Sequence, residues 1–240
     1  MNSSTLKAIL IDIDDTLYSY PECNEYGKKA VIGFLSKKLR IPEKTVTKAY
    51  NHSREAVHHD LAGQASSHSR ILYIQKCIEM LTGTTDAALT LQAHEVFWRA
   101  YLAKATLRPG VLPFLKSTRK NNLKTAIVSD LTADIQLRKI VHLKLTPYID
   151  LLITSEESGF DKHKPHSYEL ALKKLKLKAS QVVMIGDNYE VDVQGAVRVG
   201  IKPIYFEAEP RKKIAPEKKR LSISVPSFSS WADIQSHLGL

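Results

Sequence analysis

The densest group of residues that could perform chemistry is Asp12, Asp14 and Asp15, directly after an apolar run at residues 8–11. Clustered carboxylates repel one another, and a site that holds them usually neutralises them with a cation. Two carboxylates two residues apart are also common in ordinary turns. The longer pattern, an apolar run followed by Asp-x-Asp-x-Thr-Leu, is much less common in such turns. It therefore indicates a chemical site at the end of a strand.

Polar residues also follow the later apolar runs of the chain. Ser129 follows the run at 125–128, and Asp187 follows the run at 182–185 after one glycine. A third run, 151–153, leads into a Thr-Ser pair. In open α/β sheets, ligands bind at the carboxyl ends of the strands. We therefore expect distant segments of the chain to deliver these side chains to one crevice.

The elements that must position these residues can be predicted from the hydrophobic pattern. Short apolar runs without alternation predict buried strands at 8–11, 125–128, 151–153, 182–185 and, more weakly, 203–206. Helical patterns lie between them, at 113–120, 132–145, 166–177 and 192–199. Strands that alternate with helices predict an α/β fold, with a mostly parallel sheet covered on both faces.

The segment between the first two strands has a different pattern. It predicts helices at 25–39, 68–81 and 86–104, and Pro42 suits the first turn of another. An all-helical insert of this size within an α/β sheet is a candidate lid. We therefore predict an α/β core formed by residues 1–17 and 108–240, and a helical cap formed by residues 18–107.

Composition excludes few functions. The chain has 240 residues, a net charge of +10 and 43% hydrophobic residues, which suits a globular protein. The basic run at 211–220 contains no aromatic residues for base stacking, so we interpret it as a surface loop and consider nucleic acid an improbable partner. No signal peptide or membrane-spanning run is present, and two cysteines do not form a disulfide framework. These features predict a cytoplasmic protein without a membrane partner.

Four motifs, in order, resemble those of the haloacid dehalogenase superfamily of hydrolases. They are Ile9–Leu17, Ala126–Asp130, Lys164-Pro165, and Val183–Asp187 with Asp192 and Gly195-Ala196 downstream. One of these motifs alone would be weak evidence, but together they span nearly the whole chain. The resemblance implies a doubly wound, Rossmann-like sheet, with the helical insert as a cap over the active site.

The resemblance also implies a role for each matched residue. Asp12 is expected to be the nucleophile that forms an aspartyl-phosphate, and Asp14 the general acid and later the general base. Mg²⁺ is expected to be the cofactor, held by Asp12, Asp187 and the backbone carbonyl of Asp14, with Asp192 in a supporting position. The phosphate-binding candidates are Thr16, Ser129, Asp130 and Lys164.

Two of these assignments involve a choice. Lys162 lies two residues before Lys164, and Lys164 is preferred because Pro165 follows it. Related sequences often have asparagine at position 130, so Asp130 either adds negative charge near the site or points away from it.

Asp14 distinguishes between two branches of the superfamily. The dehalogenating members lack a carboxylate at that position and need no metal, so Asp14 favours phosphate ester chemistry. A small phosphorylated metabolite is the expected substrate, either a nucleoside monophosphate, as in nucleotidase-like members, or a sugar phosphate. Arg54 and Arg70 in the cap could meet an anionic tail of the substrate.

Two alternative functions remain open at this point. A phosphomutase of the same fold would return the phosphoryl group to its substrate. A non-catalytic protein that binds an anion or nucleic acid would use the basic surface, although such a protein would not need the set of Asp12, Asp14, Lys164 and Asp187.

Overall fold

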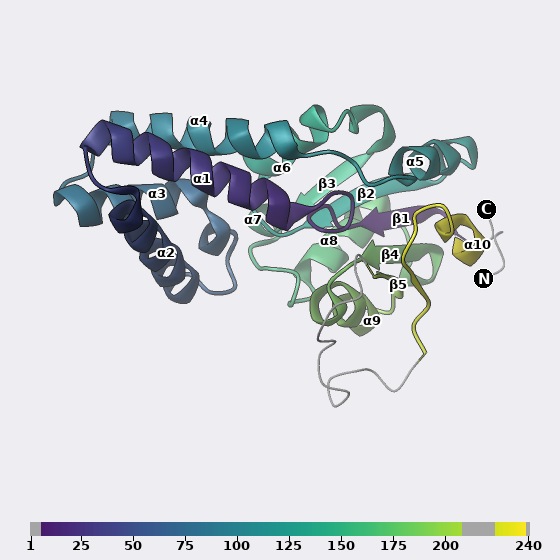
Figure 1. Cartoon of the computed structure of the whole chain (residues 1–240). Helices are drawn as coiled ribbons and strands as arrows, with labels where there is room; N and C mark the ends of the chain where they lie inside the picture. The colour runs from purple at the N-terminus through teal and green to yellow at the C-terminus, as the bar shows by residue number, and fades with distance from the viewer. Residues whose placement is uncertain (1–5, 208–223, 239–240) are drawn as a thin grey trace. The chain divides into compact units, whose positions relative to one another are not determined.

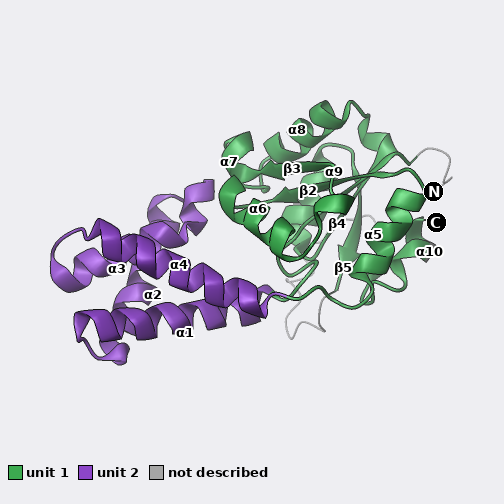
Figure 2. Cartoon of the chain, turned by 90° about the horizontal axis from the view of Figure 1, so that it is seen from above, with its two compact units in different colours: residues 1–19, 106–240 green, residues 20–105 purple. Residues whose placement is uncertain are grey.

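A computed structural model describes residues 6–207 and 224–238. The basic run at 211–220, predicted to be a surface loop, lies outside these ranges. The chain divides into two compact units, shown in Figure 2. Residues 1–19 and 106–240 form unit 1, and residues 20–105 form unit 2.

Unit 1 is built on a six-stranded sheet in the order β3-β2-β1-β4-β5-β6, and every pairing is parallel. The strands are β1 (Ala8–Ile11), β2 (Lys124–Ser129), β3 (Leu151–Thr154), β4 (Val182–Gly186), β5 (Lys202–Phe206) and β6 (Ser227–Phe228), and Figure 1 labels the first five. The predicted α/β fold class is therefore confirmed. The sequence analysis missed β6, because two residues are too short to show a periodic pattern.

Helices cover the sheet on both faces, as the continuous apolar strands require. Those of unit 1 are α5 (Val111–Lys120), α6 (Ala133–His142), α7 (Ser155–Ser158), α8 (His166–Leu175), α9 (Gln194–Arg198) and α10 (Ile234–Leu238). All four residues of the central strand β1 are buried. Leu10 and Met184 pack with Tyr168 of α8 and Ala196 of α9 in one core cluster. The sheet is thus buried and closely packed at its centre, where the first motif follows β1.

One helix of unit 1 differs from its prediction. The sequence predicts a helix over 192–199, whereas the structure has a wider π-helical turn, η5 (Tyr189–Val193), before the short α9. The side chain of Asn188 accepts hydrogen bonds from the backbone N–H groups of Glu190 and Val191 and so begins this turn. A single π turn of this kind is frequent at functional sites.

Unit 2 is all-helical, as predicted for this segment. It contains α1 (Tyr20–Leu39), α2 (Glu43–Asp60), η2 (Ala65–His68), α3 (Arg70–Thr82) and α4 (Ala87–Lys104). Arg70 is only 5% exposed, and its guanidinium lies within 5.8 Å of the ring centres of Tyr20, Tyr73, Phe97 and Trp98. The expectation that Arg70 meets a substrate is therefore replaced by a structural role, in which this cation joins the aromatic core of unit 2.

Within the described ranges, none of the helices combines the length and the apolar character that crossing a lipid bilayer requires.

The two cysteines, Cys23 and Cys77, are buried free thiols. Burial raises the pKa of Cys77 to about 12, and the thiolate is the reactive form of cysteine. We therefore expect dithiobis(nitrobenzoic acid) to modify neither thiol in the native protein, and both after denaturation. Rapid modification of the native protein would contradict this packing of unit 2.

Candidate active site

Asp12 stands at the carboxyl end of β1, where its backbone N–H donates to the carbonyl of Ile185 at 2.9 Å. Its side chain is buried, with Oδ2 3.1 Å from the hydroxyl of Thr16. That hydroxyl also lies 3.1 Å from Asp187 Oδ1 and accepts from the backbone N–H of Asp187. Thr16 therefore links the ends of β1 and β4. Its hydroxyl lies against two carboxylates, and its phosphate-binding role stays a prediction.

Two residues distant in sequence donate hydrogen bonds to backbone carbonyls of the turn after Asp12. Asp15 has φ of 64°, in the left-handed region that is uncommon for residues other than glycine. The guanidinium of Arg108 donates to its carbonyl at 3.1 Å, and the indole N–H of Trp231 donates to the carbonyl of Thr16 at 3.2 Å. These contacts stabilise a backbone conformation that the turn alone would not favour.

Asp187 follows β4 through Gly186, and Asp192 enters from the π-helical turn. A Cβ atom on Gly186 would lie 2.3 Å from Asp192 Oδ2, so a side chain at this position would displace that carboxylate. Asp192 Oδ2 also accepts from the backbone N–H of Asn188 at 3.0 Å. The glycine and the turn together bring Asp192 against the ends of the strands.

Asp12, Asp187 and Asp192 form a buried cluster in which one ligand atom from each lies within 4.8 Å of the others. Lys162 supplies one positive charge to these three carboxylates. The resulting excess of negative charge and the hard oxygen donors fit a divalent cation such as Mg²⁺. Asp192, predicted to be only a supporting residue, thus has a carboxylate in the cluster itself, whereas Asp14 does not contribute its side chain.

The lysine beside Asp12 is Lys162, and the prediction of Lys164 was wrong. Lys162 Nζ lies 2.5 Å from Asp12 Oδ1 and 2.7 Å from Asp192 Oδ1, and the residue is 4% exposed. Pro165 caps the amino end of α8, and Lys164 beside it is exposed. The proline marks the start of the helix, while the loop before it carries the buried lysine. The Lys-Pro pair therefore indicates where the helix begins and does not identify the lysine that contacts Asp12.

Ser129 is the last residue of β2 and Asp130 follows it, but the two side chains have different surroundings. The hydroxyl of Ser129 is buried and accepts from Gln136 Nε2 at 2.8 Å. Asp130 Oδ1 accepts from the backbone N–H of Lys162 at 2.8 Å. The side chain of Asp130 therefore holds the Lys162 loop, and the phosphate-binding role of Asp130 stays a prediction.

Asp14 is held by three side chains that the sequence analysis did not assign to the site. Lys139 Nζ lies 2.7 Å from both carboxylate oxygens, the hydroxyl of Tyr18 donates to Oδ1, and Gln136 Nε2 lies 3.2 Å from Oδ2. Gln136 and Lys139 share a buried face of α6. The sequence contains no local signal for this role, because each is an ordinary polar residue within a helical pattern.

The two carboxylates of the first motif have opposite pKa shifts. Burial raises the pKa of Asp12, in spite of the opposing effect of Lys162, and the carboxylates of Asp192 and Asp187 act in the same direction. Burial would also raise the pKa of Asp14, but the charge and hydrogen bonds of Lys139, with Tyr18 and Gln136, lower it below the ordinary value. These surroundings favour the ionised form of Asp14, and a cation beside Asp12 would favour the ionised form there too.

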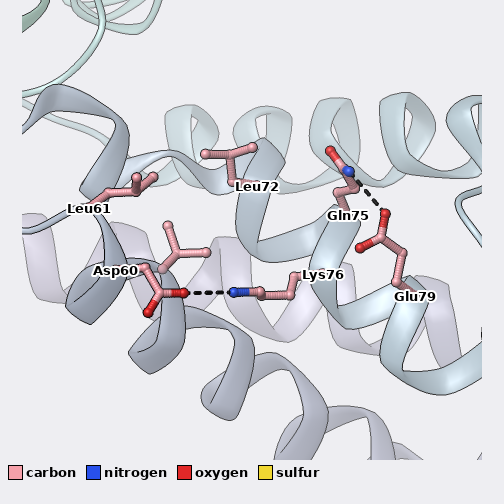
Figure 3. Close-up of a pocket in the computed structure, with 7 residues that line it drawn as sticks. Asp60, Leu61, Leu72, Gln75, Lys76 and Glu79 are labelled. Atoms are coloured by element: carbon pink, nitrogen blue, oxygen red, sulfur yellow. Dashed lines mark hydrogen bonds and ion pairs between the residues drawn. The ribbon is translucent and has the colours of Figure 1, made fainter.

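A separate pocket lies in unit 2, and Figure 3 shows seven of its residues. Its apolar lining includes Leu61 and Leu72, and the ion pair between Asp60 and Lys76 lies along one side. This pocket contains none of the residues predicted to perform chemistry. The carboxylate cluster of unit 1 is therefore the stronger candidate for an active site.

Comparison with known proteins agrees with the motifs. The family model described as haloacid dehalogenase-like hydrolase matches residues 6–200. A ribulose-1,5-bisphosphate 5-phosphatase from Halopiger xanaduensis is 36% identical over 83% of this chain and 84% of its own length. A glyceraldehyde 3-phosphate phosphatase from Methanocaldococcus jannaschii is 24% identical, covering 82% of each chain. The crystal structure of a HAD phosphatase from Thermococcus onnurineus has a TM-score of 0.75, at 20% identity over 98% of both chains.

The carboxylate cluster leads to a prediction about cation binding. Isothermal titration with Mg²⁺ should detect a site in the wild-type protein, and Asp187→Asn should weaken it by at least about tenfold, because a charged oxygen ligand is lost. Asp134→Asn, which removes an exposed carboxylate of α6, is the matched control and should bind as the wild type does. Equal weakening in both variants would contradict the assignment.

Proposed function

The chain belongs to the haloacid dehalogenase-like hydrolases, and we propose that it is a Mg²⁺-dependent phosphatase that acts on a small sugar phosphate through an aspartyl-phosphate on Asp12. The observation that supports this most is the arrangement at the carboxyl ends of the parallel strands. A buried carboxylate, Asp12, lies between a lysine and two further carboxylates, with a serine hydroxyl on the neighbouring strand. Phosphoryl transfer depends mainly on positioning and on stabilising charge, and these groups supply both.

The names of two relatives favour sugar phosphates over nucleotides as substrates. One is a ribulose-1,5-bisphosphate 5-phosphatase and the other a glyceraldehyde 3-phosphate phosphatase, and both match most of this chain. Both names describe hydrolysis of a phosphate monoester on a short polyhydroxylated carbon chain. We therefore place phosphorylated sugars of three to five carbons first among the substrates to be tested, with nucleoside monophosphates second.

In the first step, an oxygen of Asp12 attacks phosphorus, and the bond from phosphorus to the sugar oxygen breaks. The ammonium of Lys162 lies against the Asp12 carboxylate, where it would offset negative charge on the transferring group. The hydroxyl of Ser129 would donate a hydrogen bond to a phosphoryl oxygen. Mg²⁺ held by Asp12, Asp187 and Asp192, and by the backbone carbonyl of Asp14, would neutralise charge on the phosphoryl group.

Asp14 has the second chemical role. In its protonated form it donates its proton to the departing sugar oxygen, which leaves as an alcohol. The resulting carboxylate then takes a proton from a water molecule that attacks the phosphorus of the aspartyl-phosphate. This second step breaks the bond to Asp12, releases inorganic phosphate and restores both side chains. The ionised form of Asp14 favoured by its surroundings is the form required for this second step.

The test of this function is phosphate release from a panel of substrates. The panel should contain ribulose 1,5-bisphosphate, glyceraldehyde 3-phosphate, ribose 5-phosphate, nucleoside monophosphates and p-nitrophenyl phosphate. We expect release to require Mg²⁺, to stop with a chelator, and to fall at least about 1,000-fold in Asp12→Asn, because the nucleophile is lost. Conversion to an isomeric phosphate without release would instead identify a phosphomutase, and no turnover of any compound would contradict the proposal.

The corrected lysine assignment gives a sharper prediction. Lys162→Met removes the charge beside Asp12 while keeping the length of the side chain, so kcat should fall by at least about 100-fold. Lys164→Met, a matched loss of charge two residues away at an exposed position, should stay within about twofold of the wild type. The reverse order of the two effects in the phosphate-release assay would restore Lys164 as the catalytic lysine.

A further inference from the structure

Helix α6 presents two polar side chains to the interior of unit 1. Gln136 and Lys139 are three residues apart, so they lie on the same face of the helix. Both are buried, with exposed fractions of 0% and 1%, while Leu137 and Val141 of the same helix are more than half exposed. Ile135 and Ile140 are buried as well, so the inner face of this helix holds two polar side chains among apolar ones, which folding alone does not favour.

The ammonium of Lys139 contacts the carboxylate of Asp14. It lies 2.7 Å from each of the two carboxylate oxygens, and its charge also lies 5.9 Å from the ring centre of Tyr18. Tyr18 itself donates a hydrogen bond to Asp14. A carboxylate gripped at both oxygens has little freedom to rotate. The orientation of the Asp14 carboxylate is thus fixed by Lys139 of α6 and by Tyr18.

Gln136 connects this carboxylate to the second motif. Its Nε2 lies 2.8 Å from the hydroxyl of Ser129, 2.9 Å from the carbonyl of Asp130 and 3.2 Å from Asp14 Oδ2. An amide nitrogen carries two hydrogens, so three acceptors share them. Within the described part of the chain, Gln136 Oε1 is buried without a hydrogen-bond partner. Packing alone does not account for an amide in this position, because a buried unsatisfied oxygen is unfavourable.

We propose that Lys139 and Gln136 are positioning residues of the phosphatase reaction, which hold the Asp14 carboxyl group in line with the leaving sugar oxygen and with the hydroxyl of Ser129. This inference rests on the proposed function. In the step concerned, the phosphorus–oxygen bond of the ester breaks, and the oxygen takes the proton of Asp14 as the bond from Asp12 to phosphorus forms. Lys139 touches neither substrate nor phosphorus in this step and acts through Asp14.

The leaving group provides a test that a purely structural role would not satisfy. A sugar oxygen needs a proton in order to leave, whereas p-nitrophenolate leaves readily without one. In Lys139→Met, kcat/KM for the best sugar phosphate of the panel should fall by about 100-fold, the scale of general acid catalysis. For p-nitrophenyl phosphate it should stay within about fivefold of the wild type. The parameter kcat/KM is required because it ends at release of the alcohol and excludes hydrolysis of the aspartyl-phosphate.

The matched control is Arg138→Met, which removes a positive charge from the exposed face of the same helix, where Arg138 pairs with Asp134. It should leave kcat/KM for both esters unchanged, since surface ion pairs contribute little. Equal losses for both esters in Lys139→Met would overturn the inference and show that Lys139 only maintains the structure. An unchanged kcat/KM for the sugar phosphate would also overturn it.

A double variant removes the risk that Lys139→Met fails to fold with an unpaired buried carboxylate. Asp14→Asn with Lys139→Met leaves no such charge, and it is compared with Asp14→Asn alone. If Lys139 acts through Asp14, the two should agree within about threefold for both esters, because interacting residues are not additive. A further loss of tenfold or more would overturn the inference. Failure of the wild type to hydrolyse either ester would instead refute the proposed function, and this inference with it.

Discussion

Repulsion among carboxylates is the physical constraint on which the rest of unit 1 depends. Asp12, Asp187 and Asp192 gather at the ends of two neighbouring strands, in a buried place where charges interact strongly. The backbone N–H groups of Asp187 and Asn188, the hydroxyl of Thr16 and the ammonium of Lys162 all point into this region. The surrounding hydrogen bonds and the ion pair with Lys162 thus stabilise three carboxylates that would otherwise repel one another.

The order of the strands explains how residues so distant in sequence meet. Ile11 lies in register with Ile127 of β2 on one side and with Ile185 of β4 on the other. The residues that continue these three strands therefore emerge together at the same edge of the sheet. Because β1 is central and buried on both faces, this edge cannot shift without disturbing the core. A parallel sheet is well suited to fixing side chains that would otherwise move apart.

The parallel sheet and the acidic residues that follow its strands could be predicted from the sequence, because both depend on local sequence patterns. A short apolar run followed by an acidic residue identifies both the strand and the side chain at its end, which is why Asp12 and Asp187 were placed together. The conformation of the loop before α8 determines whether Lys162 or Lys164 reaches Asp12. A nearby proline does not predict that conformation. Gln136 and Lys139 look like ordinary residues of an amphipathic helix until the sheet brings Asp14 beside them. Long-range contacts of this kind are absent from local patterns.

The buried lysines are better explained by chemistry than by stability. Removing a charge from water is unfavourable, and an apolar pair of similar volume often stabilises a fold as well as a buried ion pair does. Lys139 and Asp14 satisfy each other closely, yet an apolar contact between α6 and the first turn would be simpler to build. An apolar contact, however, could not lower the pKa of Asp14 relative to that of Asp12. Burial raises the pKa of Asp12 in spite of Lys162, whereas Lys139, with Tyr18 and Gln136, outweighs burial and lowers the pKa of Asp14. The fold thus imposes opposite pKa shifts on two aspartates only two residues apart. Distinct surroundings of this kind are what allow two identical side chains to take different parts in one reaction.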